Sequence, residues 1–324
     1  MKKLWFLVFI VFIGILTGCS AKATEKPKEI NIGIQQSLSP LWIAKKKELF
    51  EKAFKEDGIK VNWIEFQSGP PQFEGIAANK LDFSVVGNTP VVAGQAANVK
   101  FKEIALAGDG VKGNGILVNK NSEIKKLEDL KGKKVAVAKG SSGFGFLYSA
   151  LKHAKVSPED VEIIQLQPDE ALPAFESGKV DAWSIWEPFL SLESMEKDAV
   201  ILANGETLGS FSPAFTLARE GFIKDYPQYV EKFLKVYDKA VRYQLENEEE
   251  AIDIYAEMKG LDKKVIKNVL DNTKPLNEPI TDRIIKAQQE TADLQFELKA
   301  IGKKIDVSEV VDNQFIEKVQ KEGK

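Results

Sequence analysis

Cysteine and histidine are nearly absent from this 324-residue chain, which contains one of each, Cys19 and His153. A single cysteine excludes an internal disulfide bond, and so few Cys and His residues leave no ligand set for a structural zinc site. One histidine, in a segment that predicts a surface or half-buried helix position, gives no basis for a Ser-His-acid catalytic set. We therefore expect no enzyme activity, no metal and no cofactor.

Phosphate-loop and nucleic-acid signals are also missing. No Gly-x-x-x-x-Gly-Lys-Ser/Thr motif occurs, and Gly143-Phe144-Gly145 lacks the acidic residue that would complete a dinucleotide-binding signature. Lys and Arg are scattered among Asp and Glu, and the net charge is −3. Without a basic stripe, a nucleic-acid partner is not expected. Beyond the first residues, no apolar run is long enough to cross a membrane.

The N-terminus has the composition of a secretory signal. Two lysines precede an almost wholly apolar run over residues 4–16, which is shorter than the roughly 20 residues of a spanning helix. The sequence Leu-Thr-Gly-Cys follows at 16–19 and resembles a bacterial lipobox, which implies cleavage before Cys19 and lipidation of that residue. A plain signal peptide with a chance cysteine is the alternative.

This N-terminal pattern predicts a location and a tether. Residues 1–18 would be the lipoprotein signal peptide, and residues 19–28, small, polar and charged, a lipidated tether. We expect the mature protein at the outer face of the bacterial cytoplasmic membrane, held by its lipid, or in the periplasm.

The remaining chain predicts an α/β protein with two lobes. Its length suggests about two domains, and strand and helix patterns alternate over residues 30–107 and again over 115–185. Such alternation is typical of mostly parallel sheets flanked by helices. The segments IAANKLDFSVVGNTP and AFESGKVDAWSIWEP resemble each other, which suggests that the lobes share one plan.

The predicted boundaries follow from where the pattern restarts. Lobe 1 would begin with residues 29–112, lobe 2 would comprise 113–208, and residues 209–324 would return to lobe 1 and end in C-terminal helices. From about residue 227 the helices are amphipathic, and we expect them to cover the outside of the lobes without contributing to a site.

Three junctions between a predicted strand and a predicted helix carry neutral hydrogen-bond donors. They are Ser68-Gly69, Asn88-Thr89 and Ser141-Ser142. Helix N-termini present unpaired N–H groups, and ligands of open α/β sheets lie outside the carboxyl ends of the strands. The three junctions together predict a site for a compact anion with several oxygens, although each alone could be an ordinary helix cap.

Aromatic residues offer a wall for the rest of a ligand. Strand alternation places Trp183 and Trp186 on opposite faces, and Trp186, at the strand end before Glu187, is the expected ligand-side residue. Trp42 could serve either the site or the core. Glu187 could pair with an amine on a ligand or cap a helix.

Several segments together resemble one family. FQSGPP at 66–71, LDFSVVGNTPVVAGQAA at 81–97, LEDLKGKKVAVAKGSS at 127–142 and VDAWSIWEPF at 180–189 are similar to the solute-binding proteins of ABC importers for aliphatic sulfonates, taurine and nitrate. The likeness covers about residues 30–240. It implies a two-lobed, type II periplasmic-binding-protein-like fold with the ligand in the cleft between the lobes.

The resemblance also implies ligand contacts. In that family the three junctions hold the anionic head, which places Ser68, Gly69, Asn88, Thr89, Ser141 and Ser142 around it. The family often continues Gly-Ser-Ser with a small residue and then polar residues, whereas this chain has Gly143-Phe144-Gly145-Phe146. This departure puts the deeper ligand contacts in doubt and could favour a more apolar tail.

The expected function is the extracytoplasmic binding component of an ABC importer for aliphatic sulfonates, either taurine-like or alkanesulfonate. Its partners would be the small anion, the permease and ATPase subunits, and the membrane through the lipid; the chain would be a monomer. The alternatives are a nitrate-binding or pyrimidine vitamin-precursor-binding protein of the same superfamily, or a secreted enzyme on this scaffold.

Overall fold

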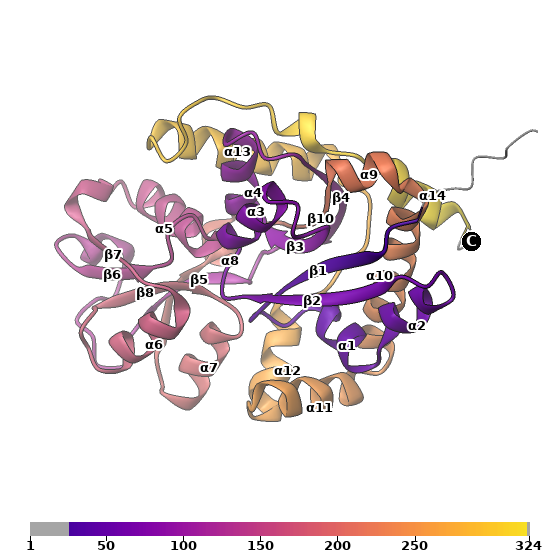
Figure 1. Cartoon of the computed structure of the whole chain (residues 1–324). Helices are drawn as coiled ribbons and strands as arrows, with labels where there is room; N and C mark the ends of the chain where they lie inside the picture. Colours follow the sequence, from indigo (N-terminus) through magenta and orange to yellow (C-terminus); the bar gives the residue numbers. More distant parts are fainter. Residues whose placement is uncertain (1–25, 323–324) are drawn as a thin grey trace, which may run out of the picture.

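Two five-stranded sheets form the framework of the molecule (Figure 1). The computed structural model describes residues 26–322. The first sheet has the order β2-β1-β3-β10-β4. Its strands are β1 (Glu29–Gln35), β2 (Lys60–Phe66), β3 (Phe83–Gly87), β4 (Phe101–Gly108) and β10 (Ala214–Arg219).

The second sheet repeats this plan with the order β7-β6-β8-β5-β9. Its strands are β5 (Asn114–Val118), β6 (Lys134–Val137), β7 (Glu162–Gln165), β8 (Ala182–Trp186) and β9 (Val200–Asn204). β3 and β8 occupy the same central place in their sheets, and they belong to the two segments whose sequences resemble each other. The resemblance between those segments therefore corresponds to a repeated topology.

Each sheet is mixed, with one strand running against the other four. β10 is antiparallel to both β3 and β4, and β5 is antiparallel to both β8 and β9. The pairs β1–β2, β1–β3, β6–β7 and β6–β8 are parallel. The two opposed strands are the first that each sheet receives after the chain crosses from the other sheet.

The chain crosses between the sheets twice. It leaves the first sheet after Gly108 and enters the second at Asn114, then leaves the second after Asn204 and returns at Ala214. The boundaries predicted at 112 and 208 fall inside these two connections. The two connections approach each other closely at Gly110. A Cβ at this position would lie 1.8 Å from the Ser212 carbonyl oxygen, so only glycine fits there.

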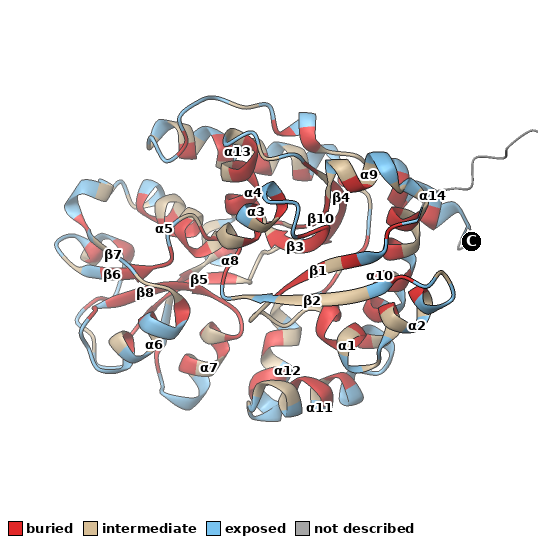
Figure 2. Ribbon diagram, in the orientation of Figure 1, coloured by how far each residue is buried: buried red, intermediate tan, exposed pale blue. Residues whose placement is uncertain are grey.

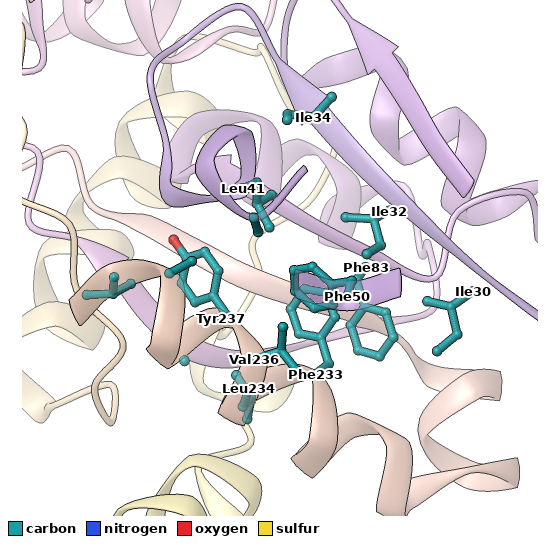
Figure 3. Packing of buried hydrophobic residues seen from close by; sticks show 14 of the residues in the cluster. Ile30, Ile32, Ile34, Leu41, Phe50, Phe83, Phe233, Leu234, Val236 and Tyr237 are labelled. Carbon is teal, nitrogen blue, oxygen red and sulfur yellow. The ribbon is translucent and has the colours of Figure 1, made fainter. Parts of the chain in front are cut away.

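Helices cover both faces of each sheet. In the first lobe, defined as the first sheet with its helices, one face packs on α1 (Pro40–Lys46), α2 (Leu49–Lys55), α10 (Pro227–Glu246) and α11 (Glu248–Lys259). The opposite face packs on α3 (Pro70–Ala77), α4 (Asn88–Ala96) and α13 (Asp282–Glu297). Figure 3 shows part of the larger cluster, in which Phe83 stacks on Phe233 with ring centroids 4.0 Å apart.

The second lobe is the second sheet with its own helices. α5 (Ser142–His153) covers one face, and α6 (Pro168–Glu176) and α7 (Phe189–Glu196) cover the other. The other helices are α8 (Gly205–Leu208), α9 (Glu220–Asp225), α12 (Lys263–Asn272) and α14 (Gln314–Glu322), with 3-10 turns η1 (Leu127–Leu130), η2 (Pro158–Asp160) and η3 (Val307–Val310).

Burial follows this layering. Buried residues gather in the strands and on the sheet-facing sides of the helices, while the outward sides are exposed (Figure 2). His153 ends α5 and is exposed, as expected for a surface helix residue. Within residues 26–322, no helix is both long and apolar enough to cross a membrane.

Candidate functional site

A cavity of about 160 Å³ lies between the two lobes. That volume is close to the roughly 150 Å³ of a protein cavity that accommodates benzene, so the space suits a small molecule. Strand ends and helix starts from both sheets line it, as expected for ligand sites of open α/β sheets. Five of the residues predicted for the site contribute to the lining: Gly69, Ser141, Ser142, Trp186 and Glu187.

The N-terminus of α5 presents the best-formed set of donors. The Ser141 hydroxyl caps the helix by accepting a hydrogen bond from the Phe144 N–H at 3.2 Å. The first intrahelical bond runs from the Gly145 N–H to the Ser141 carbonyl, which leaves the N–H groups of Ser142 and Gly143 as the unpaired donors of this helix end. The positive end of the helix dipole adds to their attraction for an anion.

The N-terminus of α3 contributes less than its position suggested. Gly69 lines the cavity, but Pro70 and Pro71 occupy the first helical positions and have no N–H to donate. Gly69 itself fits closely, since a Cβ at this position would lie 2.6 Å from the Pro90 ring. This helix start therefore shapes the cavity wall but contributes few hydrogen-bond donors to it.

The N-terminus of α4 reaches the cavity through Gly87 and Pro90, but not through the predicted Asn88 and Thr89. Asn88 and Thr89 instead border a separate space between α4, α5 and α13. The Asn88 N–H donates to the Pro213 carbonyl at 2.8 Å, and the Thr89 N–H donates to Asn88 Oδ1 at 2.8 Å. Because Pro90 has no N–H, the donors of this helix start are already used. The three helix starts therefore all border the cavity but do not offer it equivalent donors.

Ser68 is placed behind the cavity wall. Its side chain is fully buried, and its hydroxyl has no hydrogen-bond partner among the described residues. The residue is not part of the cavity lining, so a role for Ser68, Asn88 or Thr89 in binding stays a prediction.

Both tryptophans of β8 belong to the buried cluster under α6 and α7, so they are not separated onto opposite faces as strand alternation suggested. Trp183 is fully buried, whereas Trp186, at the strand end, also lines the cavity. Trp186 is 7 % exposed, so its ring is held by packing on one side and open to the cavity on the other. It can therefore supply an apolar wall at little entropic cost.

Glu187 lines the cavity, but hydrogen bonds within the protein already engage its carboxylate. Oε1 accepts from the Ser191 hydroxyl and from Asn272 Nδ2, both at 2.8 Å, and Oε2 accepts from the Ser191 N–H at 3.0 Å. Burial raises the pKa of this carboxyl, and these donors partly oppose that shift. Since Asn272 belongs to α12, Glu187 ties α7 of the second lobe to a C-terminal helix.

The loop between β1 and α1 is a part of the lining that the sequence reasoning missed. Gln35, Ser37, Leu38, Ser39 and Pro40 all border the cavity. The Trp42 indole N–H donates to the Gln35 carbonyl at 2.9 Å and to the Ser37 carbonyl at 3.2 Å, and these bonds hold the loop in place. The sequence could have predicted this part of the lining, because the loop also follows the carboxyl end of a strand and precedes a helix.

The C-terminal half supplies a further part of the lining. Tyr237, Thr273, Lys274 and Pro275 border the cavity, so the expectation that residues after about 227 only cover the outside of the lobes is wrong. Lys274 makes no ion pair within residues 26–322 and lies at the exposed side of the cavity. Asn114, at the start of β5, also borders the cavity, and its Oδ1 has no partner in the described part of the chain.

The chemistry of the cavity is that of a binding site for a small anion. The donors are mainly neutral, and the charged residues of the lining are Lys274, Asp109 and Glu187, whose carboxylate is engaged within the protein. In the described part of the chain, no group of three His, Cys, Asp or Glu side chains is placed to hold a metal ion. A two-lobed α/β molecule with a small, donor-lined cavity between its lobes is a solute-binding protein of the periplasmic-binding-protein fold.

Comparison with known proteins identifies the family. The family described as "NMT1/THI5 like" matches residues 35–251, and the chain belongs to it. A protein of Bacillus subtilis (strain 168) that is named for the binding of aliphatic sulfonates is 62% identical over 326 residues, covering 99% of this chain and 98% of that protein.

Solved structures agree in fold and in sequence. The alkanesulfonate-binding protein SsuA from Xanthomonas axonopodis pv. citri, bound to MOPS, has a TM-score of 0.84 and 30% identity, covering 89% of this chain and 99% of that one. The periplasmic aliphatic sulphonate binding protein SsuA from Escherichia coli has a TM-score of 0.79 and 30% identity, covering 89% and 93%. The resemblance inferred from the sequence motifs is confirmed.

Proposed function

We propose that this protein is the extracytoplasmic binding component of an ABC importer for aliphatic sulfonates. The observation that carries the proposal is the cavity between the lobes, which Ser141 and Ser142 of the α5 N-terminus line. A sulfonate spreads one charge over three oxygens, so several neutral donors can hold it without a buried arginine. Each such hydrogen bond contributes roughly 0.5–3 kcal/mol, which is compatible with release to a permease.

The rest of the lining supports a ligand with a short organic tail. Trp186 offers an apolar wall, and the space of about 160 Å³ accommodates a small organic tail. The carboxylate of Glu187 already accepts three hydrogen bonds, which makes it a weaker partner for an amine than its place in the sequence suggested. This favours alkanesulfonates over taurine as the better ligand.

A lipid anchor is the second part of the proposal. Cys19 and the preceding apolar run lie outside the described residues, and the support for the anchor is the Leu-Thr-Gly-Cys sequence at 16–19. We infer that the lipid on Cys19 holds a monomeric binding protein at the outer face of the membrane, next to its permease and ATPase.

The cavity-lining residues assigned to ligand binding are Gly69, Ser141, Ser142 and Trp186; no catalytic residue is assigned.

Calorimetry on the purified protein tests the ligand class. The panel contains methane-, ethane- and butanesulfonate, taurine, nitrate and a hydroxymethylpyrimidine. Alkanesulfonates should bind, and taurine should bind more weakly than ethanesulfonate. Binding of nitrate or of the pyrimidine without any sulfonate would refute the sulfonate assignment while leaving a transport role in place.

Palmitate labelling in cells tests the anchor. The wild type should incorporate label and fractionate with the membrane, and Cys19→Ala should do neither. Because Cys19 is the one cysteine in the sequence, label that persists in Cys19→Ala would contradict the lipobox assignment directly.

A further inference from the structure

Tyr237 has a hydroxyl group that borders the cavity and that nothing in the described part of the chain satisfies. The residue belongs to α10 and lines the cavity, although only 1 % of it is exposed. No hydrogen bond to its hydroxyl is present within residues 26–322. The hydroxyl is not among the fully buried unpaired atoms of the described residues, so it is open to the cavity, where a group from outside the chain can meet it.

The tyrosine ring is held rigidly. Tyr237 belongs to the large cluster of the first lobe, and its ring stacks on Phe233 with centroids 6.4 Å apart and an interplanar angle of 11°. In Figure 3 the hydroxyl points away from Phe233, out of the cluster. A side chain fixed in this way presents its donor without losing rotamer entropy when a ligand binds.

A second tyrosine of the same cluster provides a comparison for Tyr237. Tyr255, on α11, is fully buried in the same cluster, and its hydroxyl donates to Gln244 Oε1 at 2.7 Å. Tyr255 therefore pairs its hydroxyl inside the protein, whereas Tyr237 lines the cavity.

The charge state of Tyr237 suits an anionic ligand. Burial raises the pKa of its hydroxyl well above the usual range, so the group is protonated at neutral pH and is available as a neutral donor. The donor also comes from the opposite side of the molecule to the α5 N-terminus. A ligand that engages both would be held by each lobe.

We propose that Tyr237 is a ligand-binding residue whose hydroxyl donates a hydrogen bond to an oxygen of the bound anion. The inference rests on the proposed function, because it takes the ligand to be an oxyanion. It adds to the site a donor from the first lobe that lies outside the motifs of the three predicted junctions.

Tyr237→Phe tests the proposal, with Tyr255→Phe as the matched control. Tyr237→Phe removes one oxygen and keeps the packed ring, so it should weaken anion binding on the order of 10- to 100-fold in calorimetry. Its ligand-free melting temperature should stay the same or rise. Tyr255→Phe leaves Gln244 unpaired, so it should lower the melting temperature and leave affinity unchanged.

The outcomes separate the two proposals. If the wild type binds sulfonates and Tyr237→Phe binds each of them equally well, the inference is wrong and the proposed function stands. If the wild type binds nitrate and no sulfonate, the proposed function is wrong, and weaker nitrate binding by Tyr237→Phe still supports the inference. A wild type that binds no anion of the panel overturns both.

Discussion

Glu103 provides the sharpest test of the energetics of this fold. It lies on β4, is fully buried, and Oε1 accepts a hydrogen bond from Gln288 Nε2 at 2.5 Å. The other oxygen has no partner in the described part of the chain. Burial raises the pKa of this carboxyl from 4.5 to about 8, with the Gln288 bond opposing the shift. We therefore expect the folded protein to hold Glu103 protonated at neutral pH.

The sign of the pH dependence follows from proton counting. Between pH 4.5 and about pH 8 the folded state keeps a proton on Glu103 that the unfolded state has lost. The free energy of unfolding therefore falls as pH rises through this range, by about 1.4 kcal/mol per pH unit. At pH 7 the accumulated loss is about 3 kcal/mol relative to pH 4.5, and it stops growing above the folded-state pKa.

Glu103→Gln removes the ionisation and keeps a side chain of the same shape. It should be close to wild type near pH 4.5 and more stable by about 3 kcal/mol at pH 7, a melting temperature several degrees higher. Scanning calorimetry at pH 5, 7 and 8.5 measures the difference, with Glu309→Gln, an exposed residue on η3, as control. Melting curves of Glu103→Gln and wild type that shift in parallel with pH would refute the reasoning.

Three further predictions concern the site and the connection between the lobes. Ser141→Ala should weaken sulfonate binding by about 1–3 kcal/mol in calorimetry, because it removes a hydroxyl at the α5 N-terminus; Ser157→Ala, which uncaps an exposed turn elsewhere, should not. Trp186→Ala should weaken butanesulfonate binding more than methanesulfonate binding, and equal losses would contradict an apolar wall. Gly110→Ala should lower the melting temperature more than Gly132→Ala. Both glycines have positive φ, +68° and +73°, so the backbone strain is similar. A Cβ at Gly110 would lie 1.8 Å from the Ser212 carbonyl oxygen, whereas a Cβ at Gly132 would meet nothing within 4 Å.

Local sequence patterns predicted the elements of this protein well because those patterns act over short distances. Pro70 and Ser141-Ser142 marked true helix starts, and the strand end before Glu187 is where Trp186 borders the cavity. The repeated segment pattern around β3 and β8 anticipated two sheets of one topology. Each of these inferences depends on residues close together in the chain, so one sequence was enough.

Which helix starts offer donors to the cavity was decided in part by the tertiary structure. The sequence shows that Pro90 follows Asn88-Thr89, but only the chain returning at Pro213 supplies the carbonyl that uses the Asn88 N–H. The same holds for Tyr237, which reaches the cavity from a helix whose amphipathic pattern shows only that one face is buried, and for Lys274, in the loop after α12. A hydrophobic stripe fixes how a helix packs, whereas the contact of its end with a cleft depends on how the whole chain closes around two sheets.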